Sequence, residues 1–196
     1  EGFTISTRGN MTTVTGNDGS GVIYGCRELI DHVGQYKDLK FPAQLTDAPE
    51  MVLRGGCVGI QKMEYLPGRG VYEYPYTPES FPWFYDKEQW IKYLDMLVEN
   101  RMNSLYLWNG HPFASLVKLE EYPFAVEVDE ETFKKNEEMF SFLTAEADKR
   151  GIFVIQMFYN ILLSKPFAEH YGLKTQDRNR PITPLIADYT RKSIAA

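Results

Sequence analysis

The sequence is poor in the residues from which disulfide frameworks and metal centres are built. It contains two cysteines and three histidines in 196 residues. Cys26 and Cys57 fall in different expected elements, so a disulfide between them is not implied and structural thiols are favoured. His32, His111 and His170 lack the spacing of metal ligands. The sequence therefore predicts no metal and no cofactor, and it disfavours a metal-dependent enzyme.

Long apolar runs and an excess of basic charge are also lacking. No run approaches the roughly 18 apolar residues of a membrane-spanning helix, and the first residues do not form a signal-peptide pattern. The net charge is -6 and the sequence pI is about 5.2, with the basic residues scattered along the chain. A membrane span is therefore not expected, and the charge argues against a nucleic-acid partner.

Aromatic residues are abundant instead. The 13 tyrosines, 12 phenylalanines and 3 tryptophans exceed what a core of this size needs. Many of them fall in residues 61–85, a proline-rich stretch that we interpret as one long loop. Rings in such a loop fit stacking against sugars or a buried lid, and a loop that packs on itself explains them as well.

The first 48 residues predict a small α+β domain. Residues 3–7 and 11–15 have the alternation of half-buried strands, with a turn between them. Residues 22–33 follow helical spacing, and Gly34 ends the helix. Residues 41–49 contain two prolines and little periodicity, which is typical of a linker.

Beyond this linker the pattern alternates between strands and helices. Strands are expected at residues 51–58, 104–108 and 153–159, and helices at 86–100, from 129 to about 150, and from 184. Consecutive βα units form a parallel sheet with right-handed crossovers. A complete eight-stranded barrel needs about 250 residues. The predicted fold class is therefore α/β, with the small domain at residues 1–48 and the first part of an incomplete TIM-type (β/α)8 barrel at residues 49–196.

Polar residues interrupt or follow these apolar strands. Asn109 and His111 come directly after residues 105–108, as expected where a barrel strand delivers polar groups to its carboxyl-end mouth. An ordinary turn, with His111 bonded to a local carbonyl, fits equally well. Arg54 stands inside an apolar stretch, where a charge needs a partner. It is either a member of an internal ion pair or a clamp for a substrate hydroxyl or carboxylate.

Several stretches resemble glycoside hydrolases. Residues 21–30, Gly-Val-Ile-Tyr-Gly-Cys-Arg-Glu-Leu-Ile, resemble the small α/β domain that precedes the barrel in β-hexosaminidases and α-glucuronidases. Residues 51–56, Met-Val-Leu-Arg-Gly-Gly, are similar to the first barrel strand of those hexosaminidases, and residues 103–108 resemble their second strand. Residues 159–160 and 188–191 look more like α-glucuronidase-like glycosidases.

The resemblance implies a glycoside hydrolase, retaining or inverting, whose substrate lies at the mouth formed by the strand ends. By correspondence, Arg54 would bind substrate hydroxyls. The rest of the subsite would be lined by Trp108, Asn109, His111, Tyr159 and Asn160. The acid/base carboxylates of such enzymes come from the fourth strand onward. We find none at a strand end here, so the catalytic residues are expected C-terminal of this sequence.

The sequence thus predicts a fragment of a carbohydrate-active enzyme that cleaves O-glycosidic bonds of oligo- or polysaccharides. The fragment would supply substrate-binding residues and be inactive alone. Its expected partners are the carbohydrate and the rest of its own chain. An incomplete barrel would expose apolar sheet edges, so either association, for example into homo-oligomers, or partial disorder in isolation is expected. The resemblance implies a periplasmic or extracellular location. The alternative is a non-catalytic carbohydrate-binding or interaction module that uses an aromatic loop at residues 72–85.

Overall fold

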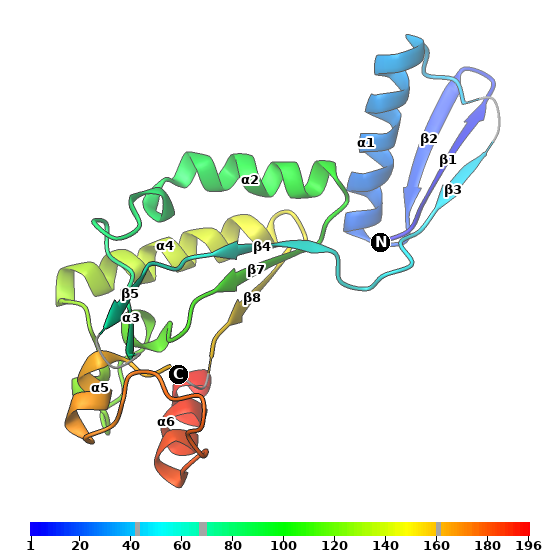
Figure 1. The fold of residues 1–196 in the computed structure, drawn as a ribbon. Helices are drawn as coiled ribbons and strands as arrows, with labels where there is room; N and C mark the ends of the chain where they lie inside the picture. The colour runs from blue at the N-terminus through cyan, green and yellow to red at the C-terminus, as the bar shows by residue number, and fades with distance from the viewer. Residues whose placement is uncertain (42–43, 67–69, 160–161) are drawn as a thin grey trace. The chain divides into compact units, whose positions relative to one another are not determined.

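The computed structural model describes residues 1–41, 44–66, 70–159 and 162–196 (Figure 1). They form a mixed α/β structure with three small sheets. The chain divides into two compact units. The first consists of residues 1–56, 91–105 and 145–153, and the second of residues 57–90, 106–144 and 154–196. Each unit is therefore assembled from segments that are distant in the sequence.

The first sheet has the strand order β2-β1-β3. Strands β1 (Phe3–Arg8) and β2 (Met11–Gly16) form the predicted antiparallel hairpin. Strand β3 (Leu45–Asp47) pairs antiparallel with the other edge of β1. The expectation of a linker at residues 41–49 is therefore wrong for these three residues. They pair with residues of β1 that lie 40 to 44 positions away, which local periodicity does not report.

Helix α1 (Gly19–Tyr36) lies along this sheet (Figure 1). It begins three residues before the predicted start because the side chain of Asp18 accepts a hydrogen bond from the amide of Gly21 at 2.7 Å and caps the helix. The helix and sheet enclose a small core around Phe3, Ile5 and Tyr24.

The second sheet has the order β4-β7-β8, with β4 (Gly55–Gly59), β7 (Ser104–Trp108) and β8 (Phe153–Met157). The amide of Ser104 donates to the carbonyl of Arg54, and farther along the amide of Ile60 donates to that of Trp108. Because the partners advance in the same direction, β4 and β7 are parallel. Helices α2 (Lys87–Glu99) and α4 (Glu130–Asp148) lie between these strands in the sequence, as predicted.

The predicted strand at residues 51–58 begins only at Gly55. Met51, Val52 and Leu53 precede it with exposed side chains. The start was predicted too early because three consecutive apolar residues have the composition of a strand. Here the carbonyls of Met51 and Val52 accept hydrogen bonds from side chains instead.

Residues 61–85, expected to be one loop, contain more regular structure. Strands β5 (Met63–Leu66) and β6 (Gly70–Glu73) pair antiparallel, and the short 3-10 helix η2 (Pro82–Tyr85) follows. The rings of Tyr76, Phe81 and Phe84 are buried, and Tyr76 stacks on Phe140 of α4 with ring centroids 6.2 Å apart. These three rings belong to the core, so they do not form an exposed platform for sugars.

The second unit also contains helices that the sequence did not predict. Helices α3 (Phe113–Leu116) and α5 (Lys165–His170) are short, with too few turns for a periodic signal. Helix α6 (Pro184–Ala195) begins where expected, with the Thr183 hydroxyl accepting from the amide of Ile186 at 3.3 Å. Tyr122, Phe167 and Tyr189 lie in the core that these segments share. None of the helices in the described part of the chain combines the length and the hydropathy that a membrane span requires.

We predict that Gly55→Ala weakens the contact between β4 and β7. An added Cβ would lie 1.9 Å from the carbonyl oxygen of Ser104. The strands would have to separate, so the free energy of unfolding should fall by about 1–3 kcal/mol in urea denaturation. Gly34→Ala in α1 is the control, because its added Cβ meets no atom within 4 Å. It should leave stability unchanged or raise it by up to about 1 kcal/mol. Equal stability of Gly55→Ala and wild type would contradict the close approach.

Candidate functional site

The carboxyl end of β7 is held by the ends of its neighbouring strands. The carbonyl of Trp108 accepts from the amide of Ile60, just after β4, at 2.8 Å. The next amide, that of Asn109, donates to the carbonyl of Met157 at the end of β8, at 3.2 Å. The polar residues that follow β7 therefore start from a fixed position.

The side chain of Asn109 fixes the turn itself. It is 1% exposed. Its Nδ2 donates to the carbonyl of Ile60 at 2.8 Å, and its Oδ1 accepts from the amide of His111 at 2.9 Å. A buried amide that is bonded on both sides is rigid, so Asn109 shapes the loop.

Glu73, the last residue of β6, contacts the same loop and is 1% exposed. Its Oε1 accepts from the amide of Gly110 at 2.9 Å and from Nε2 of Gln61 at 3.3 Å. Its Oε2 is buried and has no hydrogen-bond partner among the described residues. Burial raises the pKa of this carboxyl above its ordinary value, although both hydrogen bonds act in the opposite direction.

His111 is also buried, with 7% of its surface exposed. Its Nε2 lies 3.1 Å from the carbonyl oxygen of Glu73. Because a carbonyl only accepts, Nε2 carries the proton. Burial lowers the pKa of the imidazole, so the ring is neutral at pH 7 and Nδ1 keeps a lone pair. No hydrogen-bond partner for Nδ1 lies in the described part of the chain.

Tyr159, two residues after the end of β8, contacts the same loop. Its amide donates to the carbonyl of Gly110 at 3.1 Å. Its ring meets that of Trp108 edge to face, with centroids 4.8 Å apart. Tyr159 and His111 both line a cavity of about 20 Å³, which has room for about one water molecule.

The structure therefore brings together four of the six predicted substrate-binding residues, namely Trp108, Asn109, His111 and Tyr159. Asn160 lies outside the described residues. Their roles in binding stay predictions.

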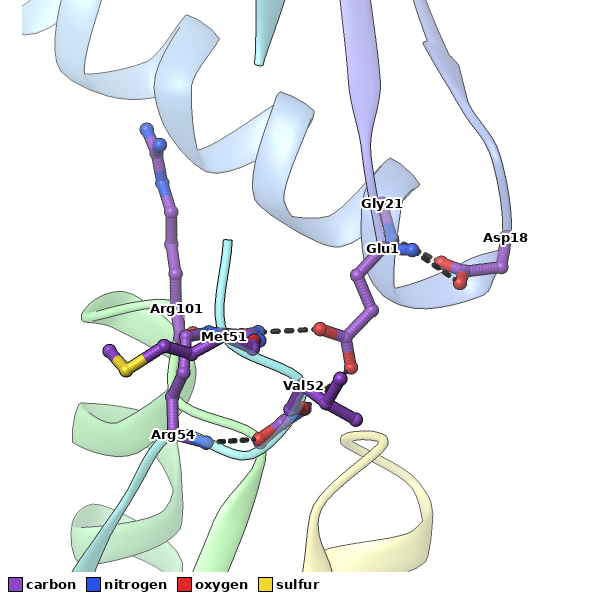
Figure 2. A network of polar contacts seen from close by, with 8 residues as sticks. Glu1, Asp18, Gly21, Met51, Val52, Arg54 and Arg101 are labelled. Atoms are coloured by element: carbon purple, nitrogen blue, oxygen red, sulfur yellow. Dashed lines mark hydrogen bonds and ion pairs between the residues drawn. The ribbon is translucent and has the colours of Figure 1, made fainter. Parts of the chain in front are cut away.

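Arg54 belongs to the other unit and directly precedes the amino end of β4. Figure 2 shows its guanidinium among groups of the chain itself. Nη2 donates to Oε2 of Glu1 at 2.6 Å, Nη1 to the carbonyl of Met51 at 2.6 Å, and Nε to that of Arg101 at 2.9 Å. The structure thus shows the internal ion pair that the sequence left open, and substrate binding by Arg54 stays a prediction.

The ion pair of Arg54 belongs to a larger polar network (Figure 2). Nδ2 of Asn103 donates to Oε1 of Glu1 at 2.8 Å, and its Oδ1 accepts from the amide of Arg54 at 2.8 Å. Burial opposes ionisation of Glu1, but the hydrogen bonds from Asn103 and Arg54 lower the pKa of its carboxyl below the ordinary value. Nearby, Arg101 forms ion pairs with Glu28 and Asp47.

Sequence reasoning missed two glutamates of the second unit that each have a buried carboxyl oxygen. Glu73 went unnoticed because residues 61–85 were interpreted as a loop, although Tyr72-Glu73-Tyr74 has the alternation of a strand. Glu127 accepts a hydrogen bond from the amide of Lys165, and its Oε2 is buried with no hydrogen-bond partner within the described ranges. Burial raises the pKa of Glu127 to about 7, against the effect of Lys165.

The described residues hold no group of three or more His, Cys, Asp and Glu side chains able to bind a metal ion. Cys26 and Cys57 are both free thiols on the surface.

We predict that Glu127→Gln stabilises the chain at alkaline pH. Glu127 binds its proton more tightly in the folded state, with a pKa of about 7 against an ordinary 4.5. Stability of the wild type should therefore fall as the pH rises through this window. In thermal unfolding the variant should match the wild type at pH 4 and exceed it at pH 8 by on the order of 1–3 kcal/mol. Glu120→Gln, at an exposed position, should show no such difference. If Glu127→Gln is no more stable than the wild type at pH 8, the raised pKa of Glu127 is contradicted.

Replacing Arg54 by methionine should destabilise the first unit. It leaves Glu1 without its cation and two carbonyls without their donor. The expected loss at pH 7 is about 1–3 kcal/mol in urea unfolding. Because the pKa of Glu1 is lowered in the folded state, the ion pair contributes above pH 4.5 and fades as the pH falls through the folded pKa. The deficit should therefore shrink in acid. Arg8→Met, at an exposed position, is the control.

The solved structures to which the chain is similar include several glycoside hydrolases. Over 100% of its length the chain is 78% identical to a GH138 enzyme targeting pectin rhamnogalacturonan II, with a TM-score of 0.91. This match spans 23% of the enzyme. No family model and no curated protein sequence matches the chain.

Two hexosaminidases share the fold at low identity. The β-N-acetylhexosaminidase of Bacteroides fragilis is 17% identical, with a TM-score of 0.57, over 99% of this chain and 39% of its own. A mutant β-hexosaminidase of Streptomyces plicatus is 11% identical, with a TM-score of 0.56, over 99% of this chain and 41% of its own. The predicted resemblance to glycoside hydrolases is therefore confirmed.

Proposed function

We propose that this chain is the part of a glycoside hydrolase that supplies substrate-binding residues, and that the enzyme cleaves O-glycosidic bonds of pectic oligo- or polysaccharides. The observation that carries the proposal is the 78% identity, along the whole chain, to an enzyme targeting pectin rhamnogalacturonan II. Because the chain spans 23% of that enzyme, the rest of the machinery belongs to a longer protein.

Within this proposal, residues 49–196 form the first units of a (β/α)8 barrel. The parallel pairing of β4 and β7, the helices between the strands and the shared fold with hexosaminidases support it. Substrates of such barrels bind at the carboxyl ends of the strands. The loop after β7 lies at that end, and Arg54 lies at the amino end of β4.

The chemistry of the loop suits a sugar. Nδ1 of the neutral His111 is buried beside a cavity with room for about one water, and a substrate hydroxyl that takes the place of this water donates to it. A carbohydrate offers hydroxyls in fixed directions. The rings of Trp108 and Tyr159 provide apolar surface for the faces of a pyranose ring. Hydrolysis itself requires two carboxyl groups flanking the bond. In our proposal the acid/base carboxylates lie C-terminal of this chain.

Location and assembly belong to the same proposal. A polymeric substrate is reached in the periplasm or outside the cell. Apolar side chains such as Val52 and Phe153, which are 85% and 60% exposed, would be covered by the rest of the enzyme or by a second copy.

The longer enzyme should hydrolyse rhamnogalacturonan II oligosaccharides, and the 196-residue chain alone should not. We expect His111→Ala in the longer enzyme to lower kcat/KM about 10- to 100-fold, because a hydroxyl of the substrate loses its acceptor. His170→Ala is the control, since His170 is exposed and is not among the described residues that line the cavity beside His111. Hydrolysis by the isolated chain, or a longer enzyme without activity on pectic oligosaccharides, would contradict the proposal.

A further inference from the structure

Glu73 holds the loop after β7 at two separate points. The oxygen Oε1 of its side chain accepts from the amide of Gly110, and its main-chain carbonyl accepts from Nε2 of His111. Both contacts come from one residue at the end of β6. A shift of the carboxyl would therefore move the backbone that carries the imidazole.

The space between Glu73 and the loop is fully occupied. A Cβ added at Gly110 would lie 1.9 Å from Oε2 of Glu73 and 2.1 Å from Cδ1 of Leu162. The carboxyl packs directly on the main chain, with no room for an intervening water. The contact is therefore a steric constraint as well as a hydrogen bond.

We propose that Glu73 is a positioning residue for substrate binding, which fixes the loop so that His111 keeps its proton on Nε2 and presents Nδ1 to a substrate hydroxyl. This inference rests on the proposed function and deepens it. Glu73 acts through His111 and does not touch the substrate.

The role of Glu73 depends on its oxygen atom as an acceptor and not on its charge. Within the described ranges no cation forms an ion pair with Glu73, and its hydrogen-bond donors are the neutral groups of Gly110 and Gln61. A neutral carboxyl and a glutamine amide each keep one carbonyl oxygen in the place of Oε1. Glu73→Gln should therefore preserve what Glu73→Ala removes.

The tautomer of His111 is measured without any activity assay. Nitrogen NMR of the 15N-histidine-labelled longer enzyme reports the tautomer, and comparison with the spectrum of His111→Ala identifies the signals of His111. The signals of His32 and His170 serve as internal controls for folding. Wild type and Glu73→Gln should show one tautomer with the proton on Nε2. Glu73→Ala should show a mixture, while Glu64→Gln on the neighbouring strand β5 should match the wild type. Gly110→Ala displaces the carboxyl from the opposite side and should give the same mixture as Glu73→Ala.

Kinetics of the longer enzyme give the second measurement. Glu73→Ala should raise KM about tenfold with kcat nearly unchanged, and Glu73→Gln should stay within about twofold of the wild type. A single tautomer in both Glu73→Ala and Gly110→Ala overturns the inference, as does Glu73→Gln behaving like Glu73→Ala in folded protein. If Glu73→Ala shows the tautomer mixture but the wild-type longer enzyme has no glycosidase activity, the positioning of His111 by Glu73 is supported. That result overturns only the proposed function.

Discussion

Buried backbone groups need hydrogen-bond partners, and the loop after β7 finds its partners at the ends of different strands. The carbonyl of Trp108 bonds to the residue after β4, the amide of Gly110 to the end of β6, and the carbonyl of Gly110 to the segment after β8. An unpaired group in this position would cost about 1–3 kcal/mol. The conformation of the loop is therefore fixed by hydrogen bonds to neighbouring strands more than by its own sequence. The residues of the candidate site are held in place by the same bonds.

The polar groups around Arg54 and around His111 differ in how completely their buried atoms are paired. Around Arg54 the charges are compensated within the chain, by a carboxylate and by carbonyls. Around His111 the compensation is incomplete, because Nδ1 of His111 and Oε2 of Glu73 are buried without partners among the described residues. A network whose charges are paired stabilises a fold, whereas buried polar atoms without partners need an explanation of their own. For His111 and Glu73 we propose that a ligand supplies it.

The features that the sequence predicted well have strong local signals. The apolar run at residues 105–108 and the capped helices on either side can be predicted from neighbouring residues alone. Strand β3 was missed because its pairing partner, β1, lies 40 to 44 positions away in the sequence. The β5–β6 hairpin is local, and it was missed because its strands are short and lie in a stretch that was interpreted as a proline-rich loop. Arg54 illustrates a third limit. Its charge predicted that it has a partner, but the sequence does not reveal at which end of the strand the guanidinium lies. The identity of that partner, Glu1, required the fold.

The way in which the two units share the chain has a consequence for synthesis. Each of β4, β7 and β8 passes from one unit into the other, and the first unit needs residues 145–153 to be complete. Contacts between segments so far apart carry a large loop-closure entropy and form slowly. During translation, the small N-terminal sheet and α1 can assemble early, but the remainder of the first unit has to wait until β8 has left the ribosome. Until then the apolar residues of β7 lack the neighbouring strand β8 and are open to aggregation.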